Sequence, residues 1–255
     1  MNLNMQGLKG IVTGGSRGIG RAVMENFLAE DMKLATCARG KAALDEAANT
    51  WSSSTYPVFT KPFDVTDNSA YEAWFKEAIE HLGGLDVLVS NVSTLESKEG
   101  IDRWKNRFEV DLMQHIKLTE LALPYLKKSA SPSIVFVASI ASVMINNSPS
   151  ELEYGAIKAA LTSYAMKLAN QLGQFNIRVN VVSPGPIVHK NGHWDLMKNK
   201  QPEFYNKVAS LSAFNRLGSP EEVANPITFL SSPRASHITG TNLRVDGATV
   251  KTVNF

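Results

Sequence analysis

Short apolar runs alternate with longer amphipathic segments along nearly the whole chain. The short runs are rich in β-branched residues, as in "LDVLVSN" and "IRVNVVSP", and predict strands. These strands are expected at residues 8–14, 32–39, 58–65, 85–91, 133–139, 177–184 and 242–247. In the longer segments apolar residues recur three and four positions apart, which predicts helices. The helices are expected at residues 21–30, 41–51, 69–82, 103–128, 154–172 and 220–230.

This alternation predicts the fold class. Strands that are apolar on both faces need cover on both sides, so we expect a doubly wound α/β fold of the Rossmann type, with a parallel seven-stranded sheet between two layers of helices. The chain has 255 residues and 44% hydrophobic content, which is enough for one such domain over residues 1–255.

Charge and cysteine content narrow the partners and the compartment. The net charge is +2, from 26 basic and 24 acidic residues spread along the chain, so a nucleic-acid partner is not expected. The single cysteine, Cys37, excludes an intramolecular disulfide, and the chain opens without a secretory signal pattern. No apolar run approaches the roughly 18 residues that cross a bilayer. We therefore expect a soluble, cytoplasmic protein whose partner is a small molecule.

The stretch "TGGSRGIGRAV", residues 13–23, carries glycines where the first expected strand meets the first expected helix. Backbone N–H groups and the positive end of the helix dipole attract a pyrophosphate at such a junction, so a dinucleotide is the expected ligand. Gly14 permits the turn, Gly18 lets backbone approach the phosphates, and Gly20 lets the helix pack closely. Their spacing is wider at the front than G-x-G-x-x-G, so by themselves they leave an ordinary turn open.

Three polar residues farther along the chain suggest acid–base chemistry. Tyr154 and Lys158 in "YGAIK" lie four apart on one face of an expected helix, and Ser139 ends an expected strand in "VFVAS". A free tyrosine has a pKa of about 10, so its phenolate needs a nearby cation to work near neutral pH, and Lys158 supplies one. Ser139 is placed to hydrogen-bond a substrate oxygen. The set suits carbonyl reduction or alcohol oxidation, although an isolated Y-x-x-x-K is more often a surface feature.

Taken together, "TGGSRGIG", "FDVTD", "LDVLVSN", "YGAIKAAL", "IRVNVVSPG" and the tail "RLGSPEEVANPITFL" resemble the short-chain dehydrogenase/reductase family over nearly the whole chain. The resemblance implies hydride transfer between a nicotinamide cofactor and a carbonyl or alcohol. It implies Tyr154 as general acid/base, Lys158 on the nicotinamide ribose and Ser139 on the substrate. It also implies a homo-oligomer, a tetramer in most members. No metal is expected.

The resemblance further implies that cofactor contacts come from the glycine turn, from the ends of strands and from the catalytic helix. These residues are Gly14, Ser16, Arg17, Gly18, Ile19, Gly20, Arg39, Asp64, Val65, Asn91, Tyr154, Lys158, Pro184, Gly185 and Ile187.

The second strand indicates which nicotinamide cofactor is bound. An acidic residue at its end would bind the ribose 2′-hydroxyl of NAD, whereas arginine accommodates the 2′-phosphate of NADP. The strand ends "TCARG", with Arg39, and Arg17 in the glycine turn is a second guanidinium for a clamp. NADP(H) is therefore favoured; NAD(H) stays open because both arginines are compatible with a solvated surface.

The chain also departs from the family pattern. Asp111 stands where the family has an asparagine that supports a proton-relay water. A carboxylate there would pair with Lys158 if the two came close and would weaken its pull on Tyr154; a harmless isosteric replacement is the alternative. Ser93 replaces a glycine of the cofactor wall, and His189 replaces a threonine that usually contacts the nicotinamide carboxamide. The segment "MINNSPSELE", residues 144–153, is slightly longer than usual and would reshape the substrate pocket.

The substrate itself carries no motif. Residues 186–212 lack a clear period, and we expect them to form a loop that covers the substrate, with Trp194 and Phe204 as an apolar lid. Two rival functions stay open. A sensor or scaffold that binds cofactor with weak or no turnover is suggested by Asp111, and a dehydratase or epimerase with tightly held NAD is the second. Retention of Ser139, Tyr154 and Lys158 speaks for the oxidoreductase.

Overall fold

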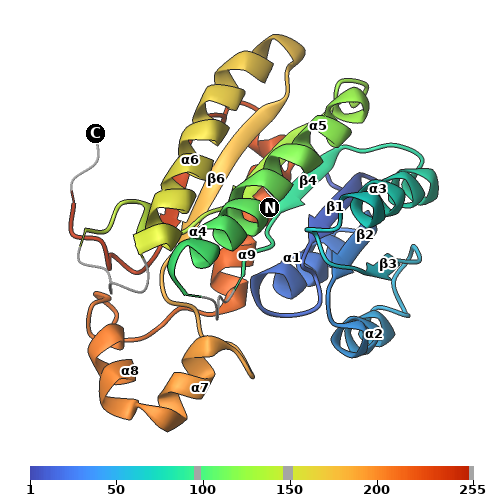
Figure 1. Ribbon diagram of the computed structural model, residues 1–255. Helices are drawn as coiled ribbons and strands as arrows, with labels where there is room; N and C mark the ends of the chain where they lie inside the picture. The colour runs from blue at the N-terminus through green and yellow to red at the C-terminus, as the bar shows by residue number, and fades with distance from the viewer. Residues whose placement is uncertain (95–98, 146–151, 253–255) are drawn as a thin grey trace.

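The computed structural model describes residues 1–94, 99–145 and 152–252, which form a parallel sheet between two helical layers (Figure 1). The sheet order is β3-β2-β1-β4-β5-β6-β7, so the direction of winding reverses between β1 and β4. The strands are β1 (Lys9–Thr13), β2 (Lys33–Ala38), β3 (Phe59–Pro62), β4 (Val87–Ser90), β5 (Ser133–Val137), β6 (Arg178–Pro184) and β7 (Asn242–Val245). The expected fold class is confirmed, and each expected strand is present.

Helices connect the strands and cover both faces of the sheet. The long helices are α1 (Gly18–Ala29), α2 (Lys41–Thr50), α3 (Asn68–Leu82), α4 (Gly100–Phe108), α5 (Gln114–Leu126), α6 (Leu152–Leu172) and α9 (Pro220–Ser231). Two of them begin at strong N-caps: Asp67 accepts a hydrogen bond from the Ala70 backbone, and Ser219 forms a capping box with Glu222. Gly83 ends α3 with a φ of 68°, a conformation that glycine adopts without strain.

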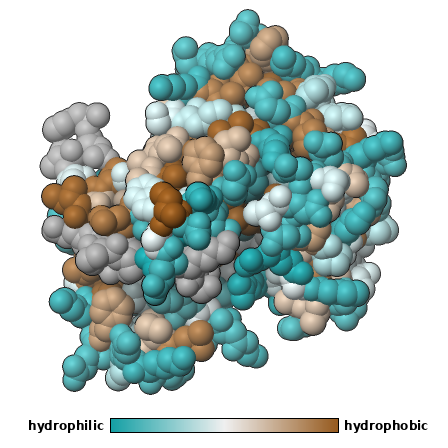
Figure 2. Space-filling view, viewed as in Figure 1, coloured by the Kyte–Doolittle hydropathy of each residue, from teal (hydrophilic) through white to brown (hydrophobic). Residues whose placement is uncertain are grey.

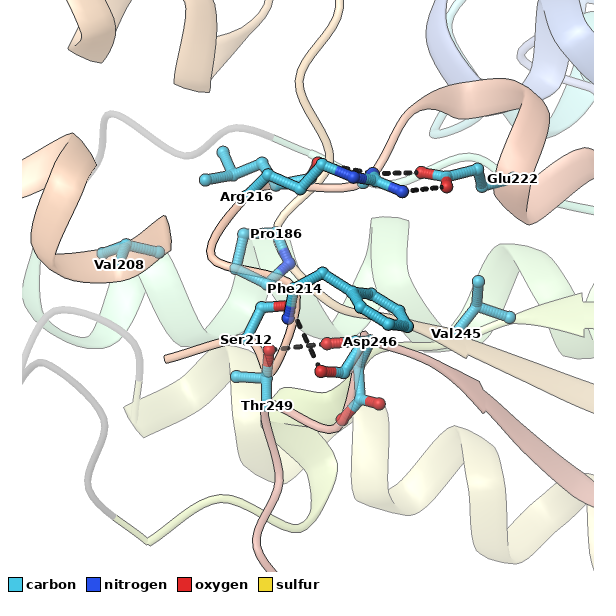
Figure 3. Close-up of a pocket in the computed structure, with 12 residues that line it drawn as sticks. Pro186, Val208, Ser212, Phe214, Arg216, Glu222, Val245, Asp246 and Thr249 are labelled. Carbon is cyan, nitrogen blue, oxygen red and sulfur yellow. Dashed lines mark hydrogen bonds and ion pairs between the residues drawn. The ribbon is translucent and has the colours of Figure 1, made fainter. Parts of the chain in front are cut away.

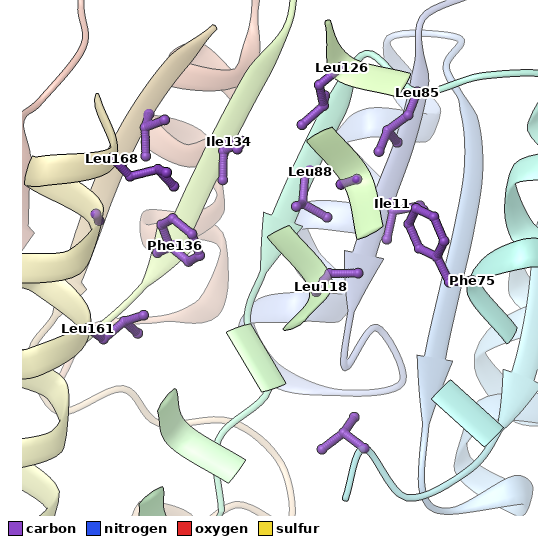
Figure 4. Packing of buried hydrophobic residues seen from close by; sticks show 14 of the residues in the cluster. Ile11, Phe75, Leu85, Leu88, Leu118, Leu126, Ile134, Phe136, Leu161 and Leu168 are labelled. Carbon is purple, nitrogen blue, oxygen red and sulfur yellow. The ribbon is translucent and has the colours of Figure 1, made fainter. Parts of the chain in front are cut away.

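Alternating residues of each strand pack into two separate hydrophobic cores, one on each face of the sheet. On one face Ile11, Leu88 and Phe136 pack with the aromatic residues of α3 and the apolar sides of α5 and α6 (Figure 4). On the other face Val12, Val89 and their neighbours pack against α1 and α9. Because successive side chains of a strand point to opposite faces, strands buried on both sides read as continuous apolar runs. This burial fixes the register and so aligns the carboxyl ends of the strands along one edge.

The long helix expected at residues 103–128 is interrupted. It runs as α4, then a π-helical turn η1 (Glu109–Met113), then α5, with the backbone N–H of Gln114 donating to the Glu109 carbonyl. A π-turn admits an extra residue into the helix and is frequent at functional sites. The expectation of one continuous α-helix was wrong because no residue pattern in this segment marks the π-turn.

Two short helices, α7 (His193–Lys200) and α8 (Pro202–Ala209), lie within the segment 186–212 that was expected to be a loop. Each has only eight residues, most of them exposed, so too few turns are present for an apolar period to be recognised in the sequence. None of the helices in the described part of the chain is both long and apolar enough to cross a membrane.

Candidate active site

The carboxyl ends of the parallel strands gather most of the predicted site residues at one edge of the sheet. Gly14 follows β1, Arg39 follows β2, Asn91 follows β4 and Ser139 follows β5, while Pro184 is the last residue of β6. Ligands of open α/β sheets bind at this edge, where the winding reverses. The structure therefore brings the expected cofactor residues and the expected catalytic residues to one region.

The turn between β1 and α1 is shaped by backbone and by Asn91. Gly14 has a φ of 75°, which suits glycine. The Asn91 side-chain amide donates to the Thr13 carbonyl at 2.9 Å, and the Asn91 backbone N–H donates to the Thr13 hydroxyl at 3.0 Å. A Cβ on Gly20 would lie 2.2 Å from the Gly14 carbonyl oxygen, so this contact between helix and turn requires glycine. Gly20 therefore lies where α1 packs closely against the turn, in the position that the sequence predicts.

His189 lies beside this turn. A Cβ on Gly18, whose φ is 55°, would lie 3.2 Å from His189 Nε2, and the other ring nitrogen is 3.1 Å from the Lys190 carbonyl. The imidazole is half-buried. The departure from the family's threonine therefore places an aromatic, ionisable ring against the glycine turn.

Tyr154 and Lys158 share one face of α6, as the spacing predicted. The Lys158 ammonium lies 5.7 Å from the centre of the Tyr154 ring, and its side chain is 1% exposed. Tyr154 itself is half-buried. The structure thus places a buried ammonium group beside a partly accessible phenol on one face of α6.

Asp111 meets Lys158 through the π-turn. Asp111 Oδ1 lies 3.0 Å from Lys158 Nζ. The two groups are therefore close enough to form the ion pair that the sequence analysis considered. Burial alone raises the pKa of the Asp111 carboxyl, but the Lys158 ammonium, a hydrogen bond from Ser93 and the Arg107 guanidinium together hold the pKa below its ordinary value. Asp111 is therefore a buried carboxylate, not a neutral stand-in for asparagine.

Sequence reasoning missed Arg107. Its Nη1 lies 3.4 Å from Asp111 Oδ2, it donates to the Thr94 carbonyl, and its guanidinium carbon lies 4.7 Å from the centre of the Tyr154 ring. The signal was available, because Arg107 and Asp111 are opposite charges four residues apart on an expected helix. A second pair was missed next to Tyr154, where Arg103 Nε lies 3.7 Å from the buried Glu153 carboxylate.

His115 is another buried group behind the site. Its Nδ1 lies 2.6 Å from the Ser90 hydroxyl at the end of β4. Burial, helped by the charge of Lys158, lowers the pKa of His115 to about 3. The ring is therefore neutral near pH 7. No motif in the sequence indicated this residue.

Ser139 begins a short 3₁₀ helix, η2 (Ile140–Ser142), that packs against α6. Its hydroxyl accepts a hydrogen bond from the Ala141 backbone at 3.1 Å, which leaves the hydroxyl hydrogen available to another acceptor. The expected effect of residues 144–153 on the pocket falls largely on residues 146–151, outside the described part of the chain.

The two arginines of the expected clamp differ in their partners. Arg39 Nη1 lies 4.0 Å from Asp64 Oδ2, and the Arg39 side chain is 61% exposed, so this ion pair is weak. Arg17 is the exposed N-cap residue of α1. Ser16 lies in the same turn, Ile19 is in the first turn of α1, and Val65 is buried beyond β3.

A separate cavity lies near the end of β7 (Figure 3). It has a volume of about 100 Å³ and is lined among others by Ser212, Phe214, Arg216 and Asp246. Ligand pockets of drug-sized molecules measure roughly 300–1,000 Å³. Because this cavity is small and none of the predicted catalytic residues lines it, we place the candidate site at Tyr154.

The fold and this edge define a dinucleotide-binding type of α/β protein, and comparisons with known proteins identify the family. A family model described as enoyl-(acyl carrier protein) reductase matches residues 14–248. Isoepoxydon dehydrogenase patN of Penicillium expansum is 36% identical over 247 residues, covering 94% of this chain and 95% of the relative. A tropinone reductase homolog of Arabidopsis thaliana is 34% identical over 249 residues, covering 96% of this chain and 92% of the relative.

Solved structures agree with these relatives. L-sorbose reductase from Gluconobacter frateurii, complexed with NADPH and L-sorbose, superposes with a TM-score of 0.89 at 29% identity, covering 99% of this chain and 100% of that one. The chain belongs to the short-chain dehydrogenase/reductase family of oxidoreductases. The resemblance stated from its motifs is thereby confirmed.

Proposed function

We propose that the protein is an NADP(H)-dependent oxidoreductase that interconverts a small carbonyl compound and its alcohol, with Tyr154 as general acid/base. The observation that carries the proposal is the Lys158 ammonium, buried 5.7 Å from the centre of the Tyr154 ring on the same helix face. A lysine that is buried beside a phenol at a ligand-binding edge supports the assignment of acid–base chemistry to this pair.

The residues divide the reaction between them. A nicotinamide held in this site would supply the hydride for reduction or accept it for oxidation. In the direction of reduction, the Tyr154 hydroxyl gives its proton to the substrate oxygen, and the Lys158 ammonium stabilises the phenolate that remains. The Ser139 hydroxyl donates a hydrogen bond to the same oxygen. In the direction of oxidation, the Tyr154 phenolate takes the proton back.

Two features support a dinucleotide in this site. The glycine turn presents backbone N–H groups at the N-terminus of α1, with positive φ at Gly14 and Gly18. Lys158 has three N–H donors, and among the residues that the structure describes its ionic partner is Asp111. Donors are therefore left for ribose hydroxyls.

The preference for NADP(H) rests on Arg39 and Arg17. Both are exposed near the end of β2 and the start of α1, and the long contact of Arg39 with Asp64 leaves its guanidinium able to bind a 2′-phosphate. The sorbose reductase that resembles this chain was solved with NADPH, which supports the same choice. NAD(H) is the competing cofactor in the experiment below.

The cover of the substrate and the assembly complete the proposal. Trp194 of α7 stacks on Phe204 of α8 at 5.9 Å between ring centres, and we assign this pair to an apolar lid.

Apolar side chains gather over α4 on the face shown in Figure 2, where Ile101, Trp104 and Phe108 are exposed. Such a patch supports a homo-oligomer. Cys37 is a buried free thiol, which fits the expected cytoplasmic location.

A cofactor-binding sensor without turnover is not favoured. It was suggested by the carboxylate at position 111, but that charge is accompanied by the second cation Arg107. The oxidoreductase names of the relatives also support turnover.

The test is a fluorescence titration of the purified protein with NADPH and with NADH. A panel of carbonyl compounds that includes ketoses and cyclic ketones is then added. We expect tighter binding of NADPH and oxidation of NADPH by at least one carbonyl. Tight binding of NADPH with no turnover across the panel would favour the sensor, and preferential binding of NADH would contradict the cofactor assignment.

A further inference from the structure

Arg107 is the least expected member of the charged cluster. Its side chain is 11% exposed, and it is held from three directions: by the Asp111 carboxylate at 3.4 Å, by the Thr94 carbonyl and by the face of the Tyr154 ring at 4.7 Å. A guanidinium buried against a carboxylate and an aromatic face has a fixed position and a fixed charge.

We infer that Arg107 is a positioning residue that balances the Asp111 carboxylate and so leaves Lys158 able to stabilise the Tyr154 phenolate. The inference rests on the proposed function, in which Tyr154 transfers the proton. It assigns a task to a residue that the catalytic motif does not include.

The charges of the cluster support this assignment. Lys158 and Arg107 are two cations and Asp111 is one carboxylate, so the cluster beside Tyr154 carries one net positive charge. Lys158 next to a neutral asparagine would carry the same net charge. The carboxylate at position 111 would cancel Lys158, because the two lie 3.0 Å apart, and Arg107 restores the balance.

The other ionisable groups around the cluster do not alter this count. Glu153, the neighbour of Tyr154 on α6, is paired with Arg103 of α4 at 3.7 Å. His115 of α5 is neutral near pH 7, because burial lowers its pKa to about 3. Among the described residues, the balance at Tyr154 is therefore set by Arg107, Asp111 and Lys158.

Opposite single substitutions test the inference. Arg107→Met removes a cation and lowers the net charge to zero, so the midpoint of the pH–rate profile moves to higher pH by roughly one unit. Asp111→Asn removes the carboxylate, and the midpoint moves to lower pH. The double variant Arg107→Met/Asp111→Asn returns the midpoint close to that of the unmodified protein, and Arg107→Lys, which retains the charge, leaves it nearly unchanged.

A second readout does not need turnover. The ultraviolet absorbance of tyrosinate is titrated in each variant and in the same variant carrying Tyr154→Phe, and the difference reports Tyr154 alone. Midpoints that shift in opposite directions in the single variants and coincide in the double variant support the inference. Single variants whose midpoints match the unmodified protein, or a double variant that shifts as far as Arg107→Met alone, contradict it.

Separate control measurements test whether each variant folds and whether the unmodified protein is active. Circular dichroism and thermal unfolding are recorded for each variant; if Arg107→Met does not fold, the downward shift of Asp111→Asn and its reversal in the double variant still decide the matter. An unmodified protein that binds NADPH but reduces no carbonyl speaks against the proposed function. The tyrosinate titration then still tests the charge balance on its own.

Discussion

The glycine turn and the charged cluster at Tyr154 lie at the same edge of the sheet but are built differently. The turn depends on missing side chains and on backbone hydrogen bonds, with Asn91 as the support of Thr13 and Gly14. The cluster depends on long, buried, charged side chains from α4, the π-turn and α6. The turn is thus sensitive to added volume, whereas the cluster is sensitive to added or removed charge.

This difference predicts that a small apolar change destroys the turn. In Gly20→Val, the new side chain meets the Gly14 carbonyl oxygen, which a Cβ would approach to 2.2 Å, and this oxygen belongs to backbone that cannot rotate away. We expect NADPH affinity to fall about 100-fold, a loss of about 3 kcal/mol, with lower thermal stability.

The matched control for this change is Gly173→Ala, because a Cβ on Gly173 meets nothing within 4 Å. We expect it to bind NADPH like the unmodified protein. Equal affinity of Gly20→Val and the control, measured by fluorescence titration, would show that the turn is not a close-packed cradle.

Near the charged cluster, the buried His115 makes the free energy of unfolding depend on pH. Its pKa is lowered by burial to about 3, below the roughly 6.5 of an unfolded histidine, so the unfolded state binds more protons between these values. The free energy of unfolding is therefore highest above about pH 6.5 and falls as the pH drops toward 3, by up to about 1.4 kcal/mol for each pH unit.

Urea unfolding at pH 7 and pH 5 measures this effect. We expect the unmodified protein to lose about 2 kcal/mol over that range from His115. His115→Gln should lose less, and His81→Gln, which alters an exposed histidine, should behave like the unmodified protein. The same loss in all three proteins would mean that His115 is not a buried neutral ring.

The smallest expected effect concerns the cofactor's 2′-phosphate. Arg39 is largely exposed, so its replacement removes one screened, charge-assisted contact and costs about tenfold in affinity. In Arg39→Asp we expect weaker binding of NADPH and stronger binding of NADH in parallel titrations. Arg244→Asp alters another arginine, on β7, and serves as control. Unaltered NADPH affinity in Arg39→Asp would refute the clamp.

The same contrast explains what the sequence could predict. The glycine turn, the strands and the Tyr154–Lys158 pair were predictable because each depends on spacing within a short segment. The π-turn was not, because no residue pattern in the segment around Asp111 marks it. His115 and Glu153 were missed because their burial follows from the packing of α5 and α4 against distant segments. Arg107 lies between these cases, since its spacing to Asp111 was visible but its contact with Tyr154 was not.

Replacement of the tyrosine tests the division between the two regions most directly. The measurement is NADPH affinity together with the turnover rate of Tyr154→Phe, with Tyr164→Phe on the same helix as control. We predict that Tyr154→Phe binds NADPH like the unmodified protein but turns over at least about 100-fold more slowly, because the proton donor is gone while the glycine turn is intact. Turnover equal to that of the Tyr164→Phe control would contradict the assignment of Tyr154 as general acid/base.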